Sequence, residues 1–252
     1  MTPEGKARVL IGTSGWSYDH WEGPFYPEGL ASAKRLEFYS QHFSTVEINT
    51  SFYHIPQEKT VFRWKEIVPE NFAFAVKAPR FITHMQKLKE PRSARRFIER
   101  MEALGDKLEV VLFQLPPFWS KDALRLSRFL AHLPKNHRYA FEFREASWYD
   151  REVYSILEQG GAALTSHDLH QIESPIEVTA EFTYLRFHGT IGTYGGKYSR
   201  LQLARQEKRI RRFLAQGLDV YAYFNNDERG FAVENAKELA MLLEPYLPPT
   251  TT

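Results

Sequence analysis

The sequence has no cysteine, which excludes disulfide bonds, thiolate metal sites and a cysteine nucleophile. It also has no run of about 18 apolar residues, the length that a membrane-spanning helix needs. A strand-like segment over residues 9–12 begins too early to leave room for a signal peptide. We therefore expect a soluble, cytoplasmic protein that makes no membrane contact.

The sequence also lacks an excess of charge of one sign and lacks internal boundaries. Its formal net charge of +2 is too small to indicate nucleic-acid binding, so any electrostatic attraction must come from local clusters. No Pro/Gly/Ser-rich linker, low-complexity run or charge block divides it. With 252 residues, 43% hydrophobic and 15% aromatic, the chain has the size at which α/β barrels stay undivided. We predict a single domain over residues 1–252.

The sequence does contain a repeated alternation of short strands and amphipathic helices. The β-branched or aromatic runs that we predict as strands cover residues 9–12, 45–51, 72–78, 110–115, 139–144, 162–167, 183–188 and 219–225. Most of the segments between them carry apolar residues three and four apart, as in Leu36, Tyr39 and Phe43. This alternation predicts an α/β fold, a single (β/α)8 TIM-type barrel, with an open doubly wound sheet as the alternative.

Residues at the expected helix ends agree with this alternation. Pro91 precedes an arginine-rich amphipathic stretch, and Gly217 follows a long helix that begins near Ser199. Ser120 is expected to cap a helix that starts at Lys121. The helix signal is weakest over residues 169–181.

Polar residues interrupt three of the predicted strands in a regular way. The polar pairs are Glu47 with Asn49, Glu142 with Arg144, and Arg186 with His188. Each pair alternates with apolar residues, and side chains in a strand alternate between its faces. Because the apolar set suits the helix layer, the polar set is predicted to point into the barrel near its C-terminal mouth, where barrel enzymes keep their chemistry. Further residues expected at this mouth are Lys77, Gln114, Asn225, Asn226 and Asp227.

These polar residues are candidate catalytic and binding groups. Glu47 or Glu142 would act as general base and His188 as acid or base partner, while cations stabilise developing negative charge. The residues expected to stabilise charge or bind substrate are Lys77, Arg144, Arg186, Asn49, Gln114, Asn225 and Asn226. A second interpretation makes Lys77 a Schiff-base nucleophile whose pKa is lowered by neighbouring arginines. The structural alternative is an internal ion network, such as Glu142 with Arg186, that only holds the barrel.

Aromatic residues also gather where the predicted strands end. The tryptophans at or just after strand ends are Trp16, Trp21, Trp119 and Trp148, whereas Trp64 falls in a predicted helix. Flat aromatic surfaces beside charged groups suit sugar rings or nucleobases, so Trp16 and Tyr53 are predicted to contact substrate. The alternative is a set of loops that pack on one another without a ligand.

A glycine-rich loop over residues 189–197 follows the seventh predicted strand. In barrels, the loops after strands seven and eight frequently bind phosphate through backbone N–H groups and a helix N-terminus. Gly189 and Lys197 are therefore expected to bind a phosphate group, with Arg200 and Arg229 nearby. The alternative is that the glycine-rich loop is a mobile lid. The spacing of its glycines matches neither a P-loop nor a dinucleotide site.

The sequence offers residue types found in divalent metal sites, but few of them are clustered. The candidates are Glu47, Glu142, His167, Asp168, His170, His188 and Asp227. The run from His167 to His170 is the one local cluster, and a polar turn explains it equally well. Because Arg144 and Arg186 would oppose a bound metal, we expect no metal and no cofactor.

Several motifs taken together resemble a known family. They are GTSGWSYDHW (12–21), FYP (25–27), VEINTSFY (46–53), FQLPP (113–117), EFR with SW (142–144 and 147–148), RFHG (186–189) and YFNND (223–227). The sequence resembles the YecE-like barrels known as domain of unknown function 72, over nearly its whole length. The resemblance implies a barrel similar to that of sugar isomerases and endonuclease IV-type nucleases, and it supplies no catalytic residues to carry over.

The leading prediction is an enzyme that acts on a phosphorylated sugar or nucleotide-like substrate at the barrel mouth, as a hydrolase, lyase or isomerase using acid/base chemistry. The alternatives are a metal-dependent endonuclease-like phosphodiesterase, by analogy of fold, and a non-catalytic module that binds a metabolite or nucleic acid. The expected partner is a small anionic or sugar-like molecule. A basic rim at the mouth would favour nucleic acid, and a charge-balanced pocket would favour a metabolite.

Overall fold

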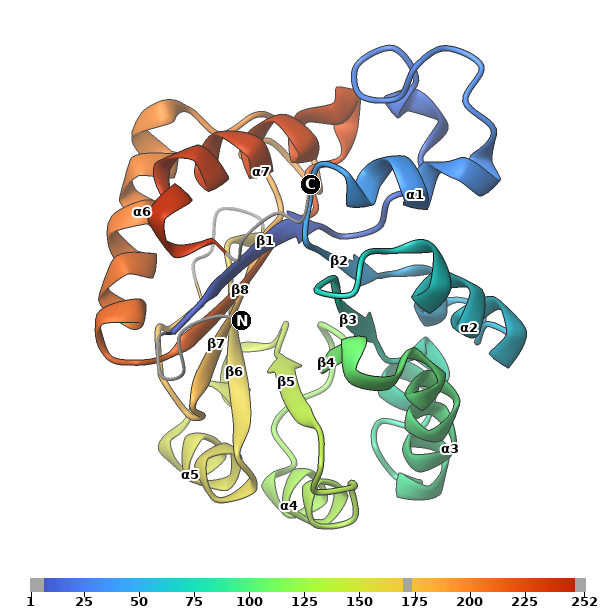
Figure 1. Cartoon of the computed structure of the whole chain (residues 1–252). Coiled ribbons are helices and arrows are strands. Elements are labelled where there is room, and N and C mark those ends of the chain that lie inside the picture. Colours follow the sequence, from blue (N-terminus) through green and yellow to red (C-terminus); the bar gives the residue numbers. More distant parts are fainter. Residues whose placement is uncertain (1–6, 170–173, 248–252) are drawn as a thin grey trace.

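The computed structural model describes residues 7–169 and 174–247, and in this part of the chain eight parallel strands form a barrel (Figure 1). The strands are β1 (Val9–Thr13), β2 (Thr45–Ile48), β3 (Ala73–Lys77), β4 (Leu108–Gln114), β5 (Arg138–Glu142), β6 (Ala162–His167), β7 (Phe182–Phe187) and β8 (Asp219–Phe224). They are hydrogen-bonded in the order β1-β8-β7-β6-β5-β4-β3-β2. A parallel bridge from Ser14 to Glu47 joins β1 to β2, so the barrel is nearly closed. The predicted fold class is confirmed.

Helices surround the barrel on the outside (Figure 1). They are α1 (Arg35–Ser40), α2 (Glu58–Ile67), α3 (Pro91–Met101), α4 (Ala123–Ala131), α5 (Arg151–Gly160), α6 (Arg200–Ala215) and α7 (Phe231–Leu242). The connection from β6 to β7, where the helix signal is weakest, contains no helix over its described residues 174–181. Instead, the Thr179 hydroxyl accepts from the Leu164 N–H at 2.8 Å and donates to the Ala162 carbonyl at 2.7 Å. This extended segment is therefore held on the backbone of β6.

Two of the three expected helix-end signals are confirmed and one is wrong. Pro91 is the first residue of α3, and Gly217 follows α6 with a φ of +79°. The helix expected to start at Lys121 behind Ser120 begins instead at Ala123, because the Asp122 carboxylate accepts the Arg125 N–H at 3.0 Å and caps it. Among the helices described, none is long and apolar enough to cross a membrane.

The inner and outer faces of the strands carry different side chains, as the alternation predicts. The inner core contains small and aromatic residues, among them Ala75 of β3, Ala140 of β5 and Tyr184 of β7. The outer residues, including Ile48 and Phe141, belong to a second core packed under the helices. Because Lys77, Glu142 and Arg186 share the parity of the inner set, they point into the barrel, and the prediction from alternation is confirmed.

A second ionic group, which the sequence did not reveal, closes the N-terminal end of the barrel. Arg8 pairs with Glu109 at 2.7 Å, and Arg138 pairs with Asp219 at 2.8 Å. The Tyr221 hydroxyl accepts from Arg138 at 2.6 Å and donates to Glu109 at 2.7 Å. Charged residues at this end of a barrel contribute to stability, whereas catalytic residues lie at the opposite end.

Candidate functional site

A buried ion network crosses the barrel at the C-terminal ends of its strands. The Arg186 guanidinium donates to both oxygens of Glu47 at 2.9 and 2.7 Å, and to Glu142 at 2.7 Å. All three side chains are fully buried. The hydroxyls of Ser14 and Tyr184 also donate to Glu47, at 2.5 and 2.7 Å, so each of its oxygens has two donors. The predicted Glu142–Arg186 contact is present, while Ser14 and Tyr184 were not foreseen.

Arg144 and His188 extend this network toward the mouth. Nε of Arg144 donates to Glu142, and its Nη2 lies 3.4 Å from Nε2 of His188. Burial by itself would raise the pKa of Glu142, but the guanidinium groups of Arg144 and Arg186 hold this pKa well below its ordinary value. Burial, aided by Arg186, lowers the pKa of His188 well below its ordinary value, so its imidazole is neutral at neutral pH. At the mouth, the charges of two carboxylates and two guanidinium groups therefore cancel.

Lys77 is the cation of the mouth without an ion-pair partner among the described residues. It is 6% exposed, and its Nζ lies 4.1 Å from the ring centre of Phe52. Burial lowers the pKa of the Lys77 amine to about 7, and the charge of Arg186 adds to this effect. Because the neighbouring carboxylates are already paired with arginines, the ammonium form of Lys77 leaves an excess positive charge. An anionic ligand or loss of the proton would restore the balance.

Three residues predicted to bind substrate line one pocket beside the mouth. Trp16, Asn49 and Tyr53 face a cavity of about 440 Å³, with Tyr18 and Trp64 also in its walls. The rings of Trp16 and Trp64 meet edge to face with their centres 5.3 Å apart. Tyr53 is 65% exposed, and Oδ1 of Asn49 is buried without a hydrogen-bond donor. A cavity with four aromatic side chains in its walls and one unsatisfied amide oxygen suits a ring that carries a hydrogen-bond donor.

The other three predicted amides lie at strand ends but differ in their contacts. Gln114 ends β4, is almost buried, and donates to the Leu115 carbonyl at 3.2 Å. Nδ2 of Asn225 lies 3.2 Å from Nδ1 of His188, so this amide belongs to the mouth. Asn226 is fully buried and donates to the carbonyl of Gly196 at 2.9 Å. Asn226 therefore holds the glycine-rich loop in place.

Gly189 is required by the backbone of the glycine-rich loop. Its φ is +105°, and a Cβ there would lie 2.1 Å from the carbonyl oxygen of Gly195. The N–H groups of Thr190 and Ile191 donate to the same oxygen at 2.9 and 3.1 Å, and the N–H of Gly189 donates to the Tyr198 hydroxyl at 2.7 Å. These three N–H groups are used within the protein, and phosphate binding by the loop stays a prediction.

Gly189→Ala is expected to lower the free energy of unfolding by about 2–4 kcal/mol, because it combines an unfavourable φ with a backbone clash. The matched control is Gly192→Ala in the same loop. Gly192 has a φ of +58° with nothing near its Cβ position, so it should lose only about 1 kcal/mol. Urea denaturation of both variants measures the difference. If both variants lost the same free energy of unfolding, the close approach of Gly195 would not be the reason for glycine at position 189.

Lys197, which was also expected to bind phosphate, is paired within the protein. Its Nζ lies 2.5 Å from Glu234 and 3.2 Å from Glu238, both on α7. The hydrogen bond that Lys197 donates to Glu234 raises the pKa of Lys197 above its ordinary value. A phosphate at this position would compete with two carboxylates for Lys197, so the geometry does not favour Lys197 as an anion-binding residue.

The tryptophans at the strand ends divide into core residues and pocket residues. Trp21 and Trp148 are fully buried. Trp148 stacks on Phe143 with an interplanar angle of 5° and donates to the Trp119 carbonyl at 2.6 Å. For these residues the loop-packing interpretation holds, whereas Trp16 lines a cavity.

The candidate metal ligands among the described residues form hydrogen bonds or ion pairs within the protein. Over residues 7–169 and 174–247, no group of three or more His, Asp or Glu side chains is arranged to hold a metal ion. Nε2 of His167 lies 3.0 Å from the Tyr149 hydroxyl, and Asp168 accepts the His188 N–H at 2.8 Å. These contacts hold the ends of β6 and β7. His170 lies outside the described residues.

A parallel barrel with polar side chains at the C-terminal ends of its strands defines this protein as a TIM-type α/β barrel with one candidate site at the mouth. The model of the family described as "Protein of unknown function DUF72" matches residues 10–251, and the chain belongs to this family. The UPF0759 protein YunF of Bacillus subtilis (strain 168) is 30% identical over 272 residues, covering 94% of this chain and 95% of YunF. The UPF0759 protein YecE of Escherichia coli (strain K12) is 32% identical over 155 residues, covering 60% of this chain and 54% of YecE.

Solved structures agree with this assignment. A DUF72 family protein from Thermotoga maritima MSB8 superposes with a TM-score of 0.84 at 28% sequence identity, covering 94% of this chain and 99% of that protein. A DUF72 family protein from Enterococcus faecalis V583 superposes with a TM-score of 0.80 at 22% identity, covering 97% and 98%. The resemblance inferred from the motifs is therefore confirmed.

Proposed function

We propose that the chain is an enzyme in which the amine of Lys77 reacts with the carbonyl group of a small, anionic, sugar-like substrate at the barrel mouth. The observation that carries the proposal is the position of Lys77. Its amine is almost buried, it has no ion-pair partner in the described part of the chain, and it adjoins a network whose charges already cancel. A lysine placed in this way is typical of Schiff-base chemistry.

The amine is ready to react near neutral pH. Because burial lowers the pKa of Lys77 to about 7, a large fraction of the amine is unprotonated and has a free lone pair. The nitrogen adds to the carbonyl carbon of an aldehyde or ketone and forms a carbinolamine. The hydroxyl of the carbinolamine takes up a proton and leaves as water while the nitrogen releases its last proton, so that both hydrogens of the water come in net from the amine and an imine remains. Arg144 is the group we assign to the anionic end of the substrate.

The carboxylates have a supporting role in this proposal. Glu47 accepts four hydrogen bonds and is sealed from solvent, and Glu142 is held by Arg144 and Arg186. Glu47 has no free lone pair for a proton. Glu142 is fully buried, but Arg144 and Arg186 outweigh this burial and hold its pKa well below its ordinary value, which makes it too weak a base for this role. We therefore assign both residues to positioning the guanidinium groups instead of the general-base role that the sequence suggested.

The pocket beside the mouth is suited to the remainder of the substrate. The loop after β2 carries Asn49 and Tyr53 in that pocket and places the ring of Phe52 on the Lys77 amine. The Ser51 hydroxyl donates to the Lys77 carbonyl at 2.6 Å and fixes this loop to the end of β3. A substrate whose ring lies in the pocket is therefore close to the segment that contacts the reactive amine.

Reductive trapping tests the proposal. The full chain is incubated with short aldoses, ketoses and their phosphates, reduced with sodium borohydride, and analysed by intact mass and peptide mapping. We expect one adduct per chain, located at Lys77, with a formation rate that rises to half its maximum near pH 7. Lys77→Arg should abolish the adduct. Lys121→Arg is the control, because Lys121 is a partly exposed lysine whose pKa is raised by its hydrogen bond to Glu152.

Two results would overturn the proposed Schiff base. One is labelling that spreads over exposed lysines and persists in Lys77→Arg. The other is the absence of any adduct with every carbonyl compound tested, which would leave a mouth that binds without covalent chemistry.

A further inference from the structure

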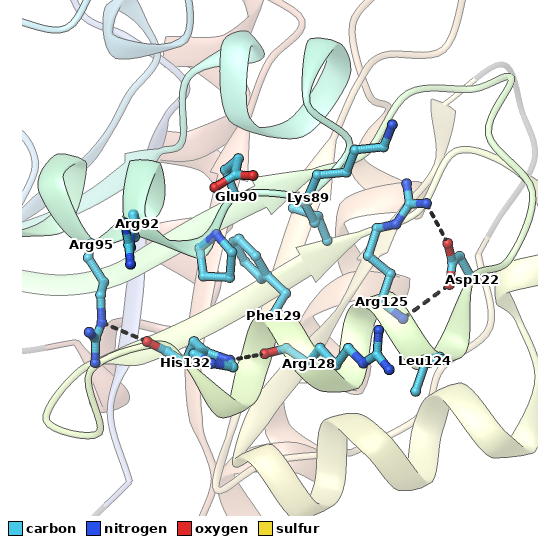
Figure 2. A pocket seen from close by; sticks show the side chains of 12 residues that line it. Lys89, Glu90, Arg92, Arg95, Asp122, Leu124, Arg125, Arg128, Phe129 and His132 are labelled. Atoms are coloured by element: carbon cyan, nitrogen blue, oxygen red, sulfur yellow. Dashed lines mark hydrogen bonds and ion pairs between the residues drawn. The ribbon is translucent and has the colours of Figure 1, made fainter.

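A cavity of about 810 Å³ lies on the outside of the barrel, between α3 and α4 (Figure 2). Its lining comes from these two helices and from the loop before α3, and it shares no residue with the mouth. Five cationic side chains surround it: Lys89, Arg92, Arg95, Arg125 and Arg128. This cavity is therefore separate from the site of the proposed reaction.

The charges around the cavity do not cancel. The lining contains two carboxylates, Glu90 and Asp122, and Asp122 already pairs with Arg125 at 3.0 Å while it caps α4. Within the described residues, none of the other four cations forms an ion pair. Five cations against two carboxylates leave a formal excess of +3, which exceeds the +2 of the whole chain. The cavity is thus a local basic cluster that the small net charge of the whole chain does not reveal.

The cations are arranged in two like-charged rows. Arg92 and Arg95 are three residues apart on α3, and Arg125 and Arg128 are three residues apart on α4. Like charges at this spacing repel and destabilise a helix by a few tenths of a kcal/mol. Arg95 donates to the His132 carbonyl at the end of α4 at 2.8 Å, and Arg125 pairs with Asp122, so the contacts of the two helices account for these residues and not for Arg92 and Arg128. A polyanion placed between the rows would remove the repulsion on both helices.

The loop that enters the cavity is strained. Lys87 and Leu88 both have left-handed φ values, +48° and +61°, although neither is glycine. Such residues cost about 1–3 kcal/mol each and gather at ligand sites. Leu88 is buried, and the Lys87 carbonyl accepts from Nη1 of Arg125 at 3.4 Å, so the strained segment is held directly against one cationic row. It also places Lys89 in the lining of the cavity.

We propose that this cavity binds a compact oligophosphate anion. Its volume lies in the range of small-molecule sites, and guanidinium groups bind phosphate through paired hydrogen bonds. The lining includes Pro91 at the first turn of α3, where the helix N-terminus adds positive potential. The one Phe, Tyr or Trp ring in the lining, Phe129, is fully buried and offers nucleobases no stacking surface. These features favour phosphate groups over a nucleic-acid strand.

Titration calorimetry with inorganic tripolyphosphate tests this inference on the full chain. The wild-type protein should bind at low ionic strength and more weakly at high ionic strength, because four of the five cations are exposed and Arg125 is partly exposed. The double variant Arg92→Gln/Arg128→Gln should bind at least about tenfold more weakly. Removal of two exposed α6 arginines, Arg205→Gln/Arg212→Gln, lowers the net charge equally and should change affinity by less than about twofold.

Three outcomes would overturn the inference. The wild-type protein fails to bind tripolyphosphate at low ionic strength, or both double variants lose affinity equally, which would indicate general surface charge. In the third, a short single-stranded oligonucleotide binds more tightly than tripolyphosphate and depends on the same arginines, which would make the cavity a nucleic-acid surface. Unchanged thermal unfolding of both double variants confirms that the fold is intact. Borohydride trapping at Lys77 is independent of these results.

Discussion

Replacing Arg186 with methionine is expected to lower the free energy of unfolding by about 3–5 kcal/mol at neutral pH. Arg186 is fully buried and is bound by the carboxylates of Glu47 and Glu142. Its removal leaves Glu47 without a cation and with only the hydroxyl donors Ser14 and Tyr184, whereas Glu142 keeps its ion pair with Arg144. Because an unpaired charge is costly in the barrel interior, the carboxyl group left without a cation should take up a proton more readily in the folded variant. The measurement is urea denaturation at several pH values.

The pH dependence of this variant has a defined sign. Buried carboxyl groups without a cation have raised pKa values, so the folded variant binds more protons than its unfolded state between about pH 5 and pH 7. Its stability should therefore rise as the pH falls toward 5, and the difference from wild type should narrow. The control is Arg138→Met at the other end of the barrel. Arg138 is partly exposed beside Asp219 and should lose about 1 kcal/mol or less. Equal losses in the two variants would contradict a special role for the mouth network.

Lys77→Met is expected to raise the free energy of unfolding by about 4 kcal/mol at pH 7 while abolishing the borohydride adduct. The pKa of Lys77 is lowered from 10.5 to about 7 in the folded protein, which means that its charged form is unfavourable there. Methionine has a similar length and carries no charge, so it removes this penalty. A gain in stability together with a loss of reactivity is expected when the replaced residue serves function at the expense of stability. Replacing a cation that only stabilises the fold would instead lower the free energy of unfolding.

The same lysine determines how stability changes with pH. Between about pH 7 and 10.5 the unfolded chain binds more protons at this residue, so wild-type stability should rise with pH in this window. Below pH 7 the residue is protonated in both states, and the advantage of Lys77→Met should be largest and constant. Lys197→Met is the control, because its pKa is raised and its loss should slightly destabilise the protein. If the free energies of unfolding of wild type and Lys77→Met changed with pH in parallel, this result would contradict the interpretation of Lys77 as a buried amine without an ion-pair partner.

Local patterns in the sequence were sufficient for the strands and for the direction of their side chains. The alternation of Val46 and Ile48 with Glu47 places one set under the helices and the other inside the barrel, because successive side chains in a strand point to opposite faces. The position of Lys77 on the inner face followed from Ala73 and Ala75 in the same way. The pattern was insufficient where no strand or helix period exists, as in residues 174–181.

The amino-acid sequence by itself determined the barrel, the face on which each polar residue lies, and the end of the barrel at which those residues meet. These are periodic properties that depend on neighbours a few positions away.

Only the tertiary structure decided the pairing of charges. Glu47 and Arg186 are 139 positions apart. Ser14, which follows β1, and Tyr184 of β7 supply the other donors to Glu47, so Lys77 stays without an ion-pair partner in the described residues. Likewise, α7 neutralises Lys197, and two helices bring Arg92 and Arg128 to one cavity. Hydrogen bonding and charge balance depend on distances between residues remote in the chain, and sequence periodicity carries no information on those distances.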